Sequence, residues 1–285
     1  MKMLVHLHVY YHEQVPWFLS KLRNIQCVPW DLLVTWSVPD SATEALVREC
    51  KPDARFMQVE NRGYDIWPFL KLTGSVSLDA YDIILKLHTK HITGKKTIHI
   101  NHMHLKVAMW RDILVDDLIG TPERVMELVS VFQAHPEVGM ACSGRLYSSM
   151  EFPEDHALLE AEMNRLGLHT DERRFCVGSM LALRPAVLQV LDKGQFEVSQ
   201  FARESATDSS GTLAHVYERI LSLLAPAQGY QVHLLGIDEE YLRLQWRKEH
   251  IQKALNWFFC LDHEGPDRQK YLTLFGLKCK IGKPQ

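Results

Sequence analysis

The fold is decided by residues 3–36, which read MLVHLHVYYHEQVPWFLSKLRNIQCVPWDLLVTW. Residues 3–9 alternate in the two-residue period of a β-strand, with a polar face near the end of the strand. A helix follows, and its apolar stripe consists of Val15, Phe18, Leu19 and Leu22. The short apolar run at residues 32–36 is typical of a parallel strand that is covered on both faces. This stretch therefore predicts a β-α-β unit.

The same alternation of strands and helices continues along the chain. Further strands are expected at residues 55–60, 81–88, 138–142, 176–183 and 230–235. Further helices are expected at residues 41–50, 68–72, 107–118, 122–132 and 213–224. Such alternation predicts an α/β sheet with right-handed crossovers, whose ligand site lies beyond the carboxyl ends of the strands.

Three segments have additional features. Ser41 and Glu44 form a capping-box signature at the start of the second helix. Residues 144–174 have weak periodicity, which predicts an insertion or a flexible loop beside the ligand site. We expect residues 1–235 to form the main domain and residues 236–285 to form a basic, partly helical extension.

Composition and charge exclude several classes of protein. The chain has 285 residues, of which 46% are hydrophobic and 24% charged, so a fibre, a repeat array and wholesale disorder are excluded. The formal net charge of −3 lacks the basic excess of a general nucleic-acid binder, so no nucleic-acid partner is expected. Any site for an anion must therefore be local.

The cysteines and the N-terminal segment indicate the compartment. The six cysteines lie far apart and form no CxxC pair, which favours buried thiols. The start of the chain lacks the apolar core and cleavage site of a signal peptide, and no window approaches the ~18 apolar residues of a membrane span. We expect a soluble protein of the reducing cytoplasm.

Cations are concentrated where the fourth expected strand ends. Lys86 and His88 lie two apart on one face of that strand, and Lys90 follows. The turn at residues 61–63, Asn-Arg-Gly, ends the preceding strand. Hydrogen-bond donors and positive charge are what a diphosphate leaving group needs. The alternative interpretation is a solvated strand end, which is the commoner outcome for a run of charges.

A cluster of histidines raises the question of a metal. Five of them fall within seventeen residues, namely His88, His91, His99, His102 and His104. Neutral imidazole is a common metal ligand, but this spacing matches no metal motif, and the neighbouring lysines would repel a divalent cation. We therefore expect no metal ligands and no cofactor.

Two carboxylates allow either a chemical or a structural interpretation. His215 and Glu218 share one face of the expected helix at residues 213–224. Glu218 could act there as a general base toward a hydroxyl, or Glu218 and Arg219 could pair with neighbours inside the protein. Asp65 could serve a site or cap the helix that follows it.

Seven segments form a specific combination in their order and spacing. They are HLHVYYHEQVPWFLSKLRNI and DLLVTWS, then ENRGYDIWPFL, YDIILKLHTKH, MWRDILVDDLIG, FCVGSMLALRP and SGTLAHVYERI. Over roughly residues 4–235 the chain resembles the rhamnan synthesis protein F family of bacterial polysaccharide glycosyltransferases. The resemblance implies transfer of a deoxysugar, typically rhamnose from dTDP-rhamnose, to a lipid-linked or cell-surface glycan.

The resemblance also implies a fold and a site. The layout looks like a GT-A nucleotide-sugar fold, a Rossmann-type, mostly parallel sheet flanked by helices, whose fourth strand normally ends in a metal-binding DxD motif. Residues 86–90 occupy that place here, so protein cations are expected to replace the metal. The donor-binding residues implied are Thr35, Asn61, Arg62, Asp65, Lys86, His88 and Lys90. The acceptor contacts implied are Gly178, His215 and Arg219, and the candidate catalytic bases are Glu218 and Asp208.

Two departures from the family's pattern leave alternatives open. Members often have Asp where this chain has Ser210, and Arg where it has Tyr64. The rival interpretations are a transferase for another nucleotide sugar, such as a hexose or furanose, and a catalytically silent glycan-binding scaffold subunit. The basic extension, with aromatic residues at 257–259, either contacts the inner membrane leaflet or packs as an appendage. Other polysaccharide-assembly enzymes are further candidate partners.

Overall fold

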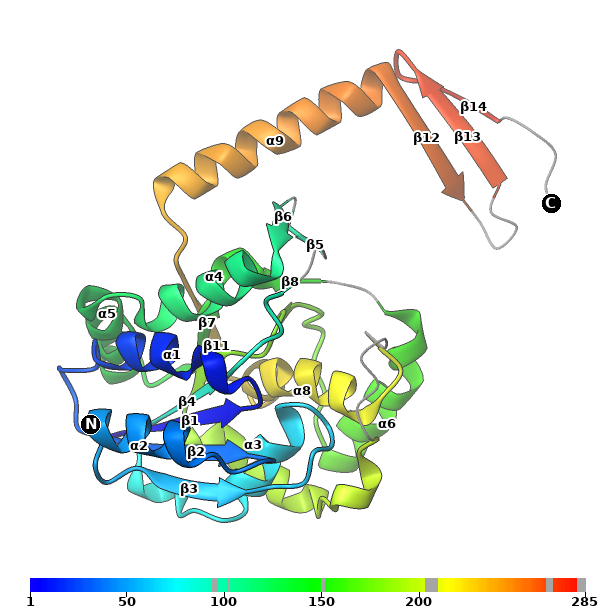
Figure 1. Ribbon diagram of the computed structural model, residues 1–285. Coiled ribbons are helices and arrows are strands. Elements are labelled where there is room, and N and C mark those ends of the chain that lie inside the picture. The colour runs from blue at the N-terminus through cyan, green and yellow to red at the C-terminus, as the bar shows by residue number, and fades with distance from the viewer. Residues whose placement is uncertain (94–96, 102, 150–151, 203–209, 265–268, 281–285) are drawn as a thin grey trace. The chain divides into compact units, whose positions relative to one another are not determined.

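The computed structural model describes residues 1–93, 97–101, 103–149, 152–202, 210–264 and 269–280. The chain divides into two compact units, Met1–Gly236 and Ile237–Gln285. The first unit is built on a seven-stranded sheet of order β11-β7-β10-β4-β1-β2-β3 (Figure 1). All of its neighbouring strands are parallel except those that pair with β10. The expected α/β class with a mostly parallel sheet is therefore confirmed.

The bounds of the elements in the first unit are as follows. The main sheet consists of β1 (Met3–Val9), β2 (Trp30–Trp36), β3 (Arg55–Gln58), β4 (Ile83–His88), β7 (Val138–Ser143), β10 (Leu181–Leu183) and β11 (Gln231–Leu235). Two small hairpins consist of β5 (Thr97–Ile100) with β6 (Met103–Lys106), and β8 (Tyr147–Ser148) with β9 (Phe175–Cys176). The helices are α1 (Val15–Leu22), α2 (Ser41–Cys50), α3 (Ile66–Thr73), α4 (Val107–Ile119), α5 (Pro122–Ala134), α6 (His156–Leu166), α7 (Pro185–Leu188) and α8 (Leu213–Ala227). Short 3-10 turns are η1 (His12–Gln14), η2 (Leu78–Ala80), η3 (Gly144–Leu146), η4 (Pro153–Asp155), η5 (Gln189–Gly194) and η6 (Val198–Gln200).

Helices form a layer on each face of the sheet. One layer contains α1, α2, α4 and α5, and the other contains α3, α6, α7 and α8 (Figure 1). The first three strands run β1, β2, β3 in sequence, and the chain then crosses back through α3 to β4 beside β1. The carboxyl ends of β1, β2 and β4 therefore meet at one edge, where a sheet of this type reverses its strand order.

Several local expectations were wrong, each for a physical reason. Strand β3 ends at Gln58 rather than at position 60. The cap of α2 is Asp40, whose carboxylate accepts the backbone N–H of Thr43, so the capping box expected at Ser41 does not form. Residues 144–174 are not simply a loop, because they contain η3, β8 and helix α6, and Met163 and Leu166 of α6 are buried.

The strand expected at residues 176–183 is divided into β9 and β10. The break at residues 177–180 includes Gly178, with φ +104°, and Ser179, with φ +48°. A Cβ at position 178 would lie 2.7–3.1 Å from side-chain atoms of Leu114 and Trp110, so glycine is needed for both conformation and space. This break turns the chain toward the end of β4, where the site described below lies.

The core of the first unit lies between the sheet and its two helical layers. Strand β1 is buried along its whole length, although it carries His6 and His8. These two histidines lie on one face of the strand, toward α3, where the ring centroid of His6 is 5.6 Å from that of Phe69. Buried polar side chains in a central strand need partners, and they mark the region that a hydrophobic pattern alone does not explain.

The second unit consists of a long helix and a small antiparallel sheet. Helix α9 (Glu239–Phe258) leads into β12 (Phe259–Glu264), β13 (Gln269–Leu274) and β14 (Leu277–Lys280), paired in that order. The helical part of the extension was expected, whereas its strands were not. Among the helices that the structure describes, none is long and apolar enough to cross a membrane.

Candidate active site

Three parallel strands bring a row of polar side chains to one edge of the sheet. The strand register places His8 beside both Thr35 of β2 and His88 of β4. Two residues earlier on the same face, the register pairs His6 of β1 with Lys86 of β4. All five side chains are buried. The alternation of a β-strand therefore gathers them on the face that α3 covers.

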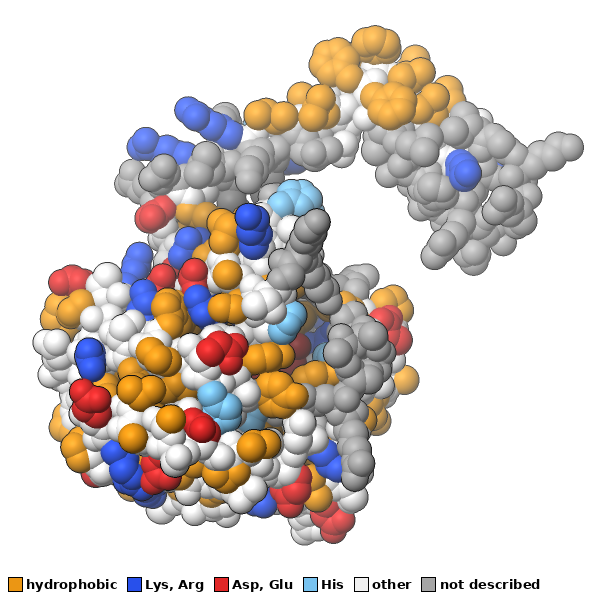
Figure 2. Space-filling view, in the orientation of Figure 1, with side chains coloured by type: hydrophobic (Ala, Val, Ile, Leu, Met, Phe, Trp, Pro, Cys, Tyr) orange, Lys and Arg blue, Asp and Glu red, His pale blue; other side chains and the backbone are white. Residues whose placement is uncertain are grey.

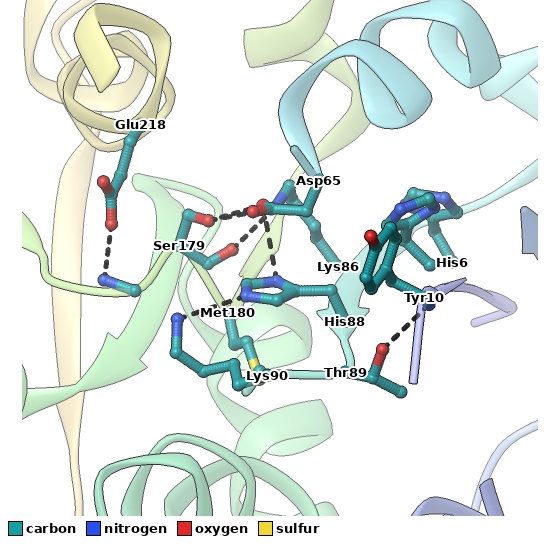
Figure 3. A network of polar contacts seen from close by, with 12 residues as sticks. His6, Tyr10, Asp65, Lys86, His88, Thr89, Lys90, Ser179, Met180 and Glu218 are labelled. Carbon is teal, nitrogen blue, oxygen red and sulfur yellow. Dashed lines mark hydrogen bonds and ion pairs between the residues drawn. The ribbon is translucent and has the colours of Figure 1, made fainter. Parts of the chain in front are cut away.

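Asp65 lies at the centre of the polar contacts that follow this row (Figure 3). Its Oδ2 forms an ion pair with the Nζ of Lys86 and accepts the hydroxyl of Ser179 at 2.8 Å. Lys86 also donates to the carbonyl and to the hydroxyl oxygen of Ser179, each at 3.0 Å. An ammonium has three N–H donors, so Lys86 has an acceptor in the protein for each of them. Its side chain is 0% exposed.

His88 lies between Asp65 and Lys90. Its Nδ1 is 3.3 Å from the Oδ2 of Asp65, and its Nε2 is 3.4 Å from the Nζ of Lys90. An ammonium can only donate, so the Nε2 of His88 must be the acceptor and its proton sits on Nδ1, facing Asp65. His88 therefore connects the two charges as a neutral group with a defined tautomer.

The backbone and the side chain of Lys90 are both held in place. The buried carboxamide of Gln14 donates to the carbonyl of Lys90 at 2.5 Å and accepts its backbone N–H at 3.3 Å. The Nζ of Lys90 lies 3.8 Å from the ring centroid of Trp110, a cation–π contact. The indole N–H of Trp110 donates to the carbonyl of Val177 at 2.9 Å. These contacts aim a half-buried ammonium at the strand edge.

Glu218 reaches the same edge from α8. Its Oε1 accepts the backbone N–H of Gly178 at 2.7 Å (Figure 3). Gly178 directly precedes Ser179, so one turn of chain contacts both carboxylates, Asp65 through a side chain and Glu218 through a backbone amide. This arrangement fixes the half-buried carboxylate of Glu218 close enough to Lys90 to raise the pKa of the Lys90 ammonium.

Burial and neighbouring charges set the protonation states here. Burial alone would raise the pKa of Asp65, but His88, Lys86 and Lys90 together lower it well below its ordinary value. Burial lowers the pKa of His88 well below its ordinary value, although Asp65 opposes the shift. Burial also lowers the pKa of Lys90, while Glu218 and Asp65 raise it. Asp65 is therefore an ionised hydrogen-bond acceptor, and His88 is neutral at neutral pH.

Three of the expected donor contacts need correction. Thr35 is 0% exposed, and its hydroxyl bridges the Nε2 of His6 at 2.8 Å and the Nδ1 of His8 at 2.9 Å, so it belongs to the interior. His88 is not a cation, because burial disfavours its charged form. Lys86 has no N–H left for a ligand. Sequence spacing could not distinguish a buried ammonium from an accessible one.

Two of the expected acceptor contacts also need correction. The N–H of Gly178 is used by Glu218. Arg219 forms an ion pair with Asp155 at 2.8 Å, and its guanidinium lies 4.4 Å and 5.1 Å from the ring centroids of Phe152 and Phe175. Both residues therefore have partners within the protein. Arg219 points away from Glu218 on α8, and so it reaches Asp155 instead of the strand edge.

The structure also describes the surroundings of three other expected site residues, His215, Arg62 and Asn61. The hydroxyl group of Thr212 contacts the Nδ1 of His215 at 2.8 Å, and the ring centroid of His215 is 5.4 Å from that of Tyr64. Arg62 donates to the carbonyl of Phe201 at 2.9 Å, which holds the turn that begins with the exposed Asn61. Asp208 lies outside the described residues.

The sequence interpretation missed three residues that organise this site, namely Gln14, Trp110 and Ser179. Trp110 fell only within the helix expected at residues 107–118, and Ser179 only within the strand expected at residues 176–183. The Gly-Ser pair at the expected strand's centre was the available signal for Ser179, because glycine there indicates a break. No local pattern indicates that Gln14 pairs with Lys90, which lies 76 positions away.

The groups at the end of β4 do not suit the divalent cation that a GT-A fold often binds. The carboxylate nearest to that strand, Asp65, already forms an ion pair with Lys86. Lys90 adds a further positive charge, which would oppose a divalent cation. Within the described ranges, no cluster of three or more His, Cys, Asp or Glu side chains is placed to hold a metal.

The comparisons with known proteins identify the family. Residues 1–230 match the family described as rhamnan synthesis protein F. The chain therefore belongs to the rhamnan synthesis protein F family, which is the family that the motifs implied. The chain is 30% identical over 187 residues to WxcX, an uncharacterized protein of Xanthomonas campestris pv. campestris. That match covers 61% of this chain and 24% of WxcX, so this chain spans about a quarter of its curated relative.

Solved structures with a similar fold include three proteins from different organisms. S. aureus TarS (residues 1–349) has a TM-score of 0.44 and 13% identity, covering 90% of this chain and 66% of that one. Glucosyl-3-phosphoglycerate synthase from Mycobacterium tuberculosis, with Mn2+ and UDP-glucose, has a TM-score of 0.39 and 12% identity, covering 98% and 88%. Mannosyltransferase PcManGT from Pyrobaculum calidifontis, with GDP-Man and Mn2+, has a TM-score of 0.36 and 17% identity, covering 93% and 65%.

Proposed function

We propose that this chain transfers a sugar from a nucleotide sugar to a hydroxyl of a bacterial cell-surface polysaccharide or lipid-linked glycan. The donor we propose is dTDP-rhamnose, in keeping with the family to which residues 1–230 belong. We assign this function to the first unit, Met1–Gly236, because the polar groups described above all belong to it.

The observation that carries the proposal is the placement of Glu218 and Lys90 at the same carboxyl edge of the sheet. One is a carboxylate fixed by the amide of Gly178, and the other is an ammonium fixed by His88 and the ring of Trp110. Sugar transfer needs a base for the attacking hydroxyl and a positive charge for the departing diphosphate. These two side chains supply both.

The mechanism we propose is a direct displacement. Glu218 takes the proton of the acceptor hydroxyl as the hydroxyl oxygen attacks the anomeric carbon. The bond from that carbon to the diphosphate oxygen breaks, and its electron pair leaves with the diphosphate, whose negative charge Lys90 stabilises. His215, on the same helix as Glu218, is the proposed acceptor contact, and Asn61 and Arg62 are proposed to contact the donor. Asp208 is the alternative base.

We further propose that the reaction is independent of a metal. The support is the set of groups at the end of β4, where Asp65 is already paired with Lys86 and Lys90 adds a further positive charge. Positive protein groups can stabilise a leaving diphosphate in the place of a metal ion.

We also propose that the protein acts in the cytoplasm, at the inner face of the membrane, through its second unit. Trp257, Phe258 and Phe275 pack against one another and are each at least half exposed. Figure 2 shows hydrophobic side chains gathered where α9 ends, and the nearby Lys278 and Lys280 are exposed. Exposed aromatic rings with lysines suit an anionic bilayer surface. Sedimentation with phosphatidylglycerol vesicles, but not with phosphatidylcholine vesicles, is expected; sedimentation with neither would contradict this proposal.

Donor turnover tests the proposed reaction. A thermal-shift panel of dTDP-, UDP- and GDP-sugars identifies the donor that stabilises the native state. Hydrolysis or transfer with that donor is then measured in EDTA, for the wild type and for Glu218→Gln. We expect wild-type turnover in EDTA and a loss of about 100-fold or more in the variant. Glu160→Gln, at an exposed position of α6, is the matched control and should retain activity.

Each other outcome points to a different interpretation. Stabilisation by a UDP- or GDP-sugar instead of dTDP-rhamnose would replace the donor. A requirement for added Mn2+ would contradict metal independence. Glycan binding without turnover of any nucleotide sugar would favour the scaffold subunit, and full activity of Glu218→Gln would transfer the role of base to another carboxylate.

A further inference from the structure

The two oxygens of Asp65 have different surroundings. Oδ2 forms an ion pair with Lys86 and accepts the hydroxyl of Ser179 at 2.8 Å, and the Nδ1 of His88 lies 3.3 Å from it without a hydrogen bond. Within the described part of the chain, no hydrogen bond or ion pair reaches Oδ1. The Asp65 side chain is 16% exposed, whereas that of Lys86 is 0% exposed. One oxygen is therefore anchored by the protein, and the other is available to a ligand.

Asp65 is held by hydrogen bonds from Lys86 and Ser179 and does not act as a helix cap. Asp65 precedes α3, yet its side chain makes no capping hydrogen bond there. Ser179 instead bonds both members of the Lys86–Asp65 pair, and it does so from a left-handed backbone conformation, φ +48°, that a serine rarely adopts. Such a conformation persists only where the surrounding contacts determine it.

Lys86 and Lys90, the two lysines at the end of β4, differ in the N–H donors and the charge that they keep for a ligand. Each N–H of Lys86 has an acceptor, and its charge is balanced by Asp65. Lys90 has the Nε2 of His88 at 3.4 Å and the ring of Trp110, and no direct ion pair within the described residues. Lys90 is also half-buried rather than fully enclosed. Its ammonium therefore keeps donors and charge for an incoming anion.

An ionised carboxylate and an ammonium select different parts of a nucleotide sugar. A carboxylate only accepts hydrogen bonds, so it suits the hydroxyl groups of a sugar and repels a diphosphate. An ammonium attracts the diphosphate. We propose that Lys86 and Ser179 are positioning residues that hold Asp65 as the acceptor for hydroxyl groups of the transferred sugar, while Lys90 contacts the diphosphate. The inference rests on the proposed function and refines the three-cation site expected from the sequence.

Binding measurements with and without the sugar test this division. Calorimetry measures two affinities, one for the nucleoside diphosphate and one for the nucleotide sugar that the wild type binds. The affinities of the wild type are compared with those of three variants: Asp65→Asn, Lys90→Met and the double variant Asp65→Asn/Lys86→Met. For Asp65→Asn we expect diphosphate affinity within about twofold of wild type and about tenfold weaker binding of the nucleotide sugar. For Lys90→Met we expect both ligands to bind about tenfold more weakly.

The double variant distinguishes positioning from direct contact. If Lys86 acts only through Asp65, its removal from Asp65→Asn costs no further affinity for either ligand, as in a fully coupled double-mutant cycle. The double variant also leaves no unpaired buried charge, and circular dichroism establishes that it is folded. A loss of diphosphate affinity as large as that of Lys90→Met would overturn the inference. Failure of the wild type to bind any nucleotide would instead overturn the proposed function, and the inference with it.

Discussion

Two buried ion pairs of the first unit look alike but serve different ends. Lys86–Asp65 lies at the end of β4, and Arg219–Asp155 lies beneath the start of α8, with side chains 7% and 1% exposed. In the second pair both carboxylate oxygens have partners, since Asp155 also accepts the N–H of Gly211 at 2.5 Å. In the first pair one carboxylate oxygen remains for a ligand. The two pairs therefore differ in whether the aspartate keeps a carboxylate oxygen without a protein partner, and not in the types of residue that form them.

The adjacent residues Glu218 and Arg219 teach the same lesson. Successive positions on a helix point about 100° apart, so neighbours in sequence enter different surroundings. Glu218 reaches Gly178 at the strand edge, whereas Arg219 reaches Asp155 between two phenylalanine rings. Only the first is proposed to act in catalysis.

The largest expected effect concerns the structural pair. Arg219→Met leaves Asp155 buried without its cation, which should lower the free energy of unfolding by about 3–5 kcal/mol. Urea unfolding followed by circular dichroism measures this change. The matched control is Arg174→Met, whose pair with Glu172 is exposed and should change stability by about 1 kcal/mol or less. If the folded fraction of Arg219→Met bound the nucleotide sugar more weakly than wild type, the assigned contrast between the two pairs would be wrong.

The next effect is a pH dependence of stability that arises from His8, near the Lys86–Asp65 pair. Burial lowers the pKa of His8 from 6.5 to about 4, so the unfolded chain takes up a proton first as the pH falls. Stability from this group is complete above pH 6.5 and is lost as the pH falls to about 4, by about 3 kcal/mol. His6 and His88, also buried with lowered pKa values, act in the same direction.

The variant His8→Gln isolates this contribution. Unfolding free energies of the wild type and the variant, measured between pH 7 and pH 4, should converge as the pH falls, since only the wild type loses the His8 term. Parallel curves for the two proteins would show that His8 is protonated in the folded state, contrary to its burial.

The smallest effect compares two buried serines. Ser179 contacts the Lys86–Asp65 pair, and Ser222 accepts the backbone N–H of Cys176 at 3.0 Å within the core. Replacement of either by alanine should lower the unfolding free energy by about 1 kcal/mol. Only Ser179→Ala should also weaken the binding of the nucleotide sugar, measured by calorimetry. Equal sugar affinities for the two variants would remove Ser179 from its positioning role.

Much of the main domain could be predicted because its signals are local. The two-residue period of residues 3–9 and the helical stripe ending at Leu22 predicted β1 and α1, and the structure has both. The interruption at residues 177–180 was not predicted, because the apolar residues on both sides of Gly178 and Ser179 favour one continuous strand. The β12–β14 sheet was not predicted, because its strands are short and charged residues interrupt their apolar pattern.

The site was predicted only in part, because charges were visible in the sequence but their partners were not. Asp65, Lys86, His88, Lys90 and Glu218 do come together. Thr35, Gly178 and Arg219 each have a partner inside the protein that lies far along the chain, and the sequence does not reveal these partners.

The sequence by itself determined most strands and helices of the main domain, the family, and the place where charged groups collect, because periodicity and motifs are carried by neighbouring residues. Only the tertiary structure decided which of those charges are neutralised within the protein and which remain for a ligand. Ser179 meets Lys86 across 93 positions and Asp65 across 114. Hydrogen bonds over such separations follow from the packing of the whole sheet, since burial makes an unpaired polar group costly wherever it lies in the chain.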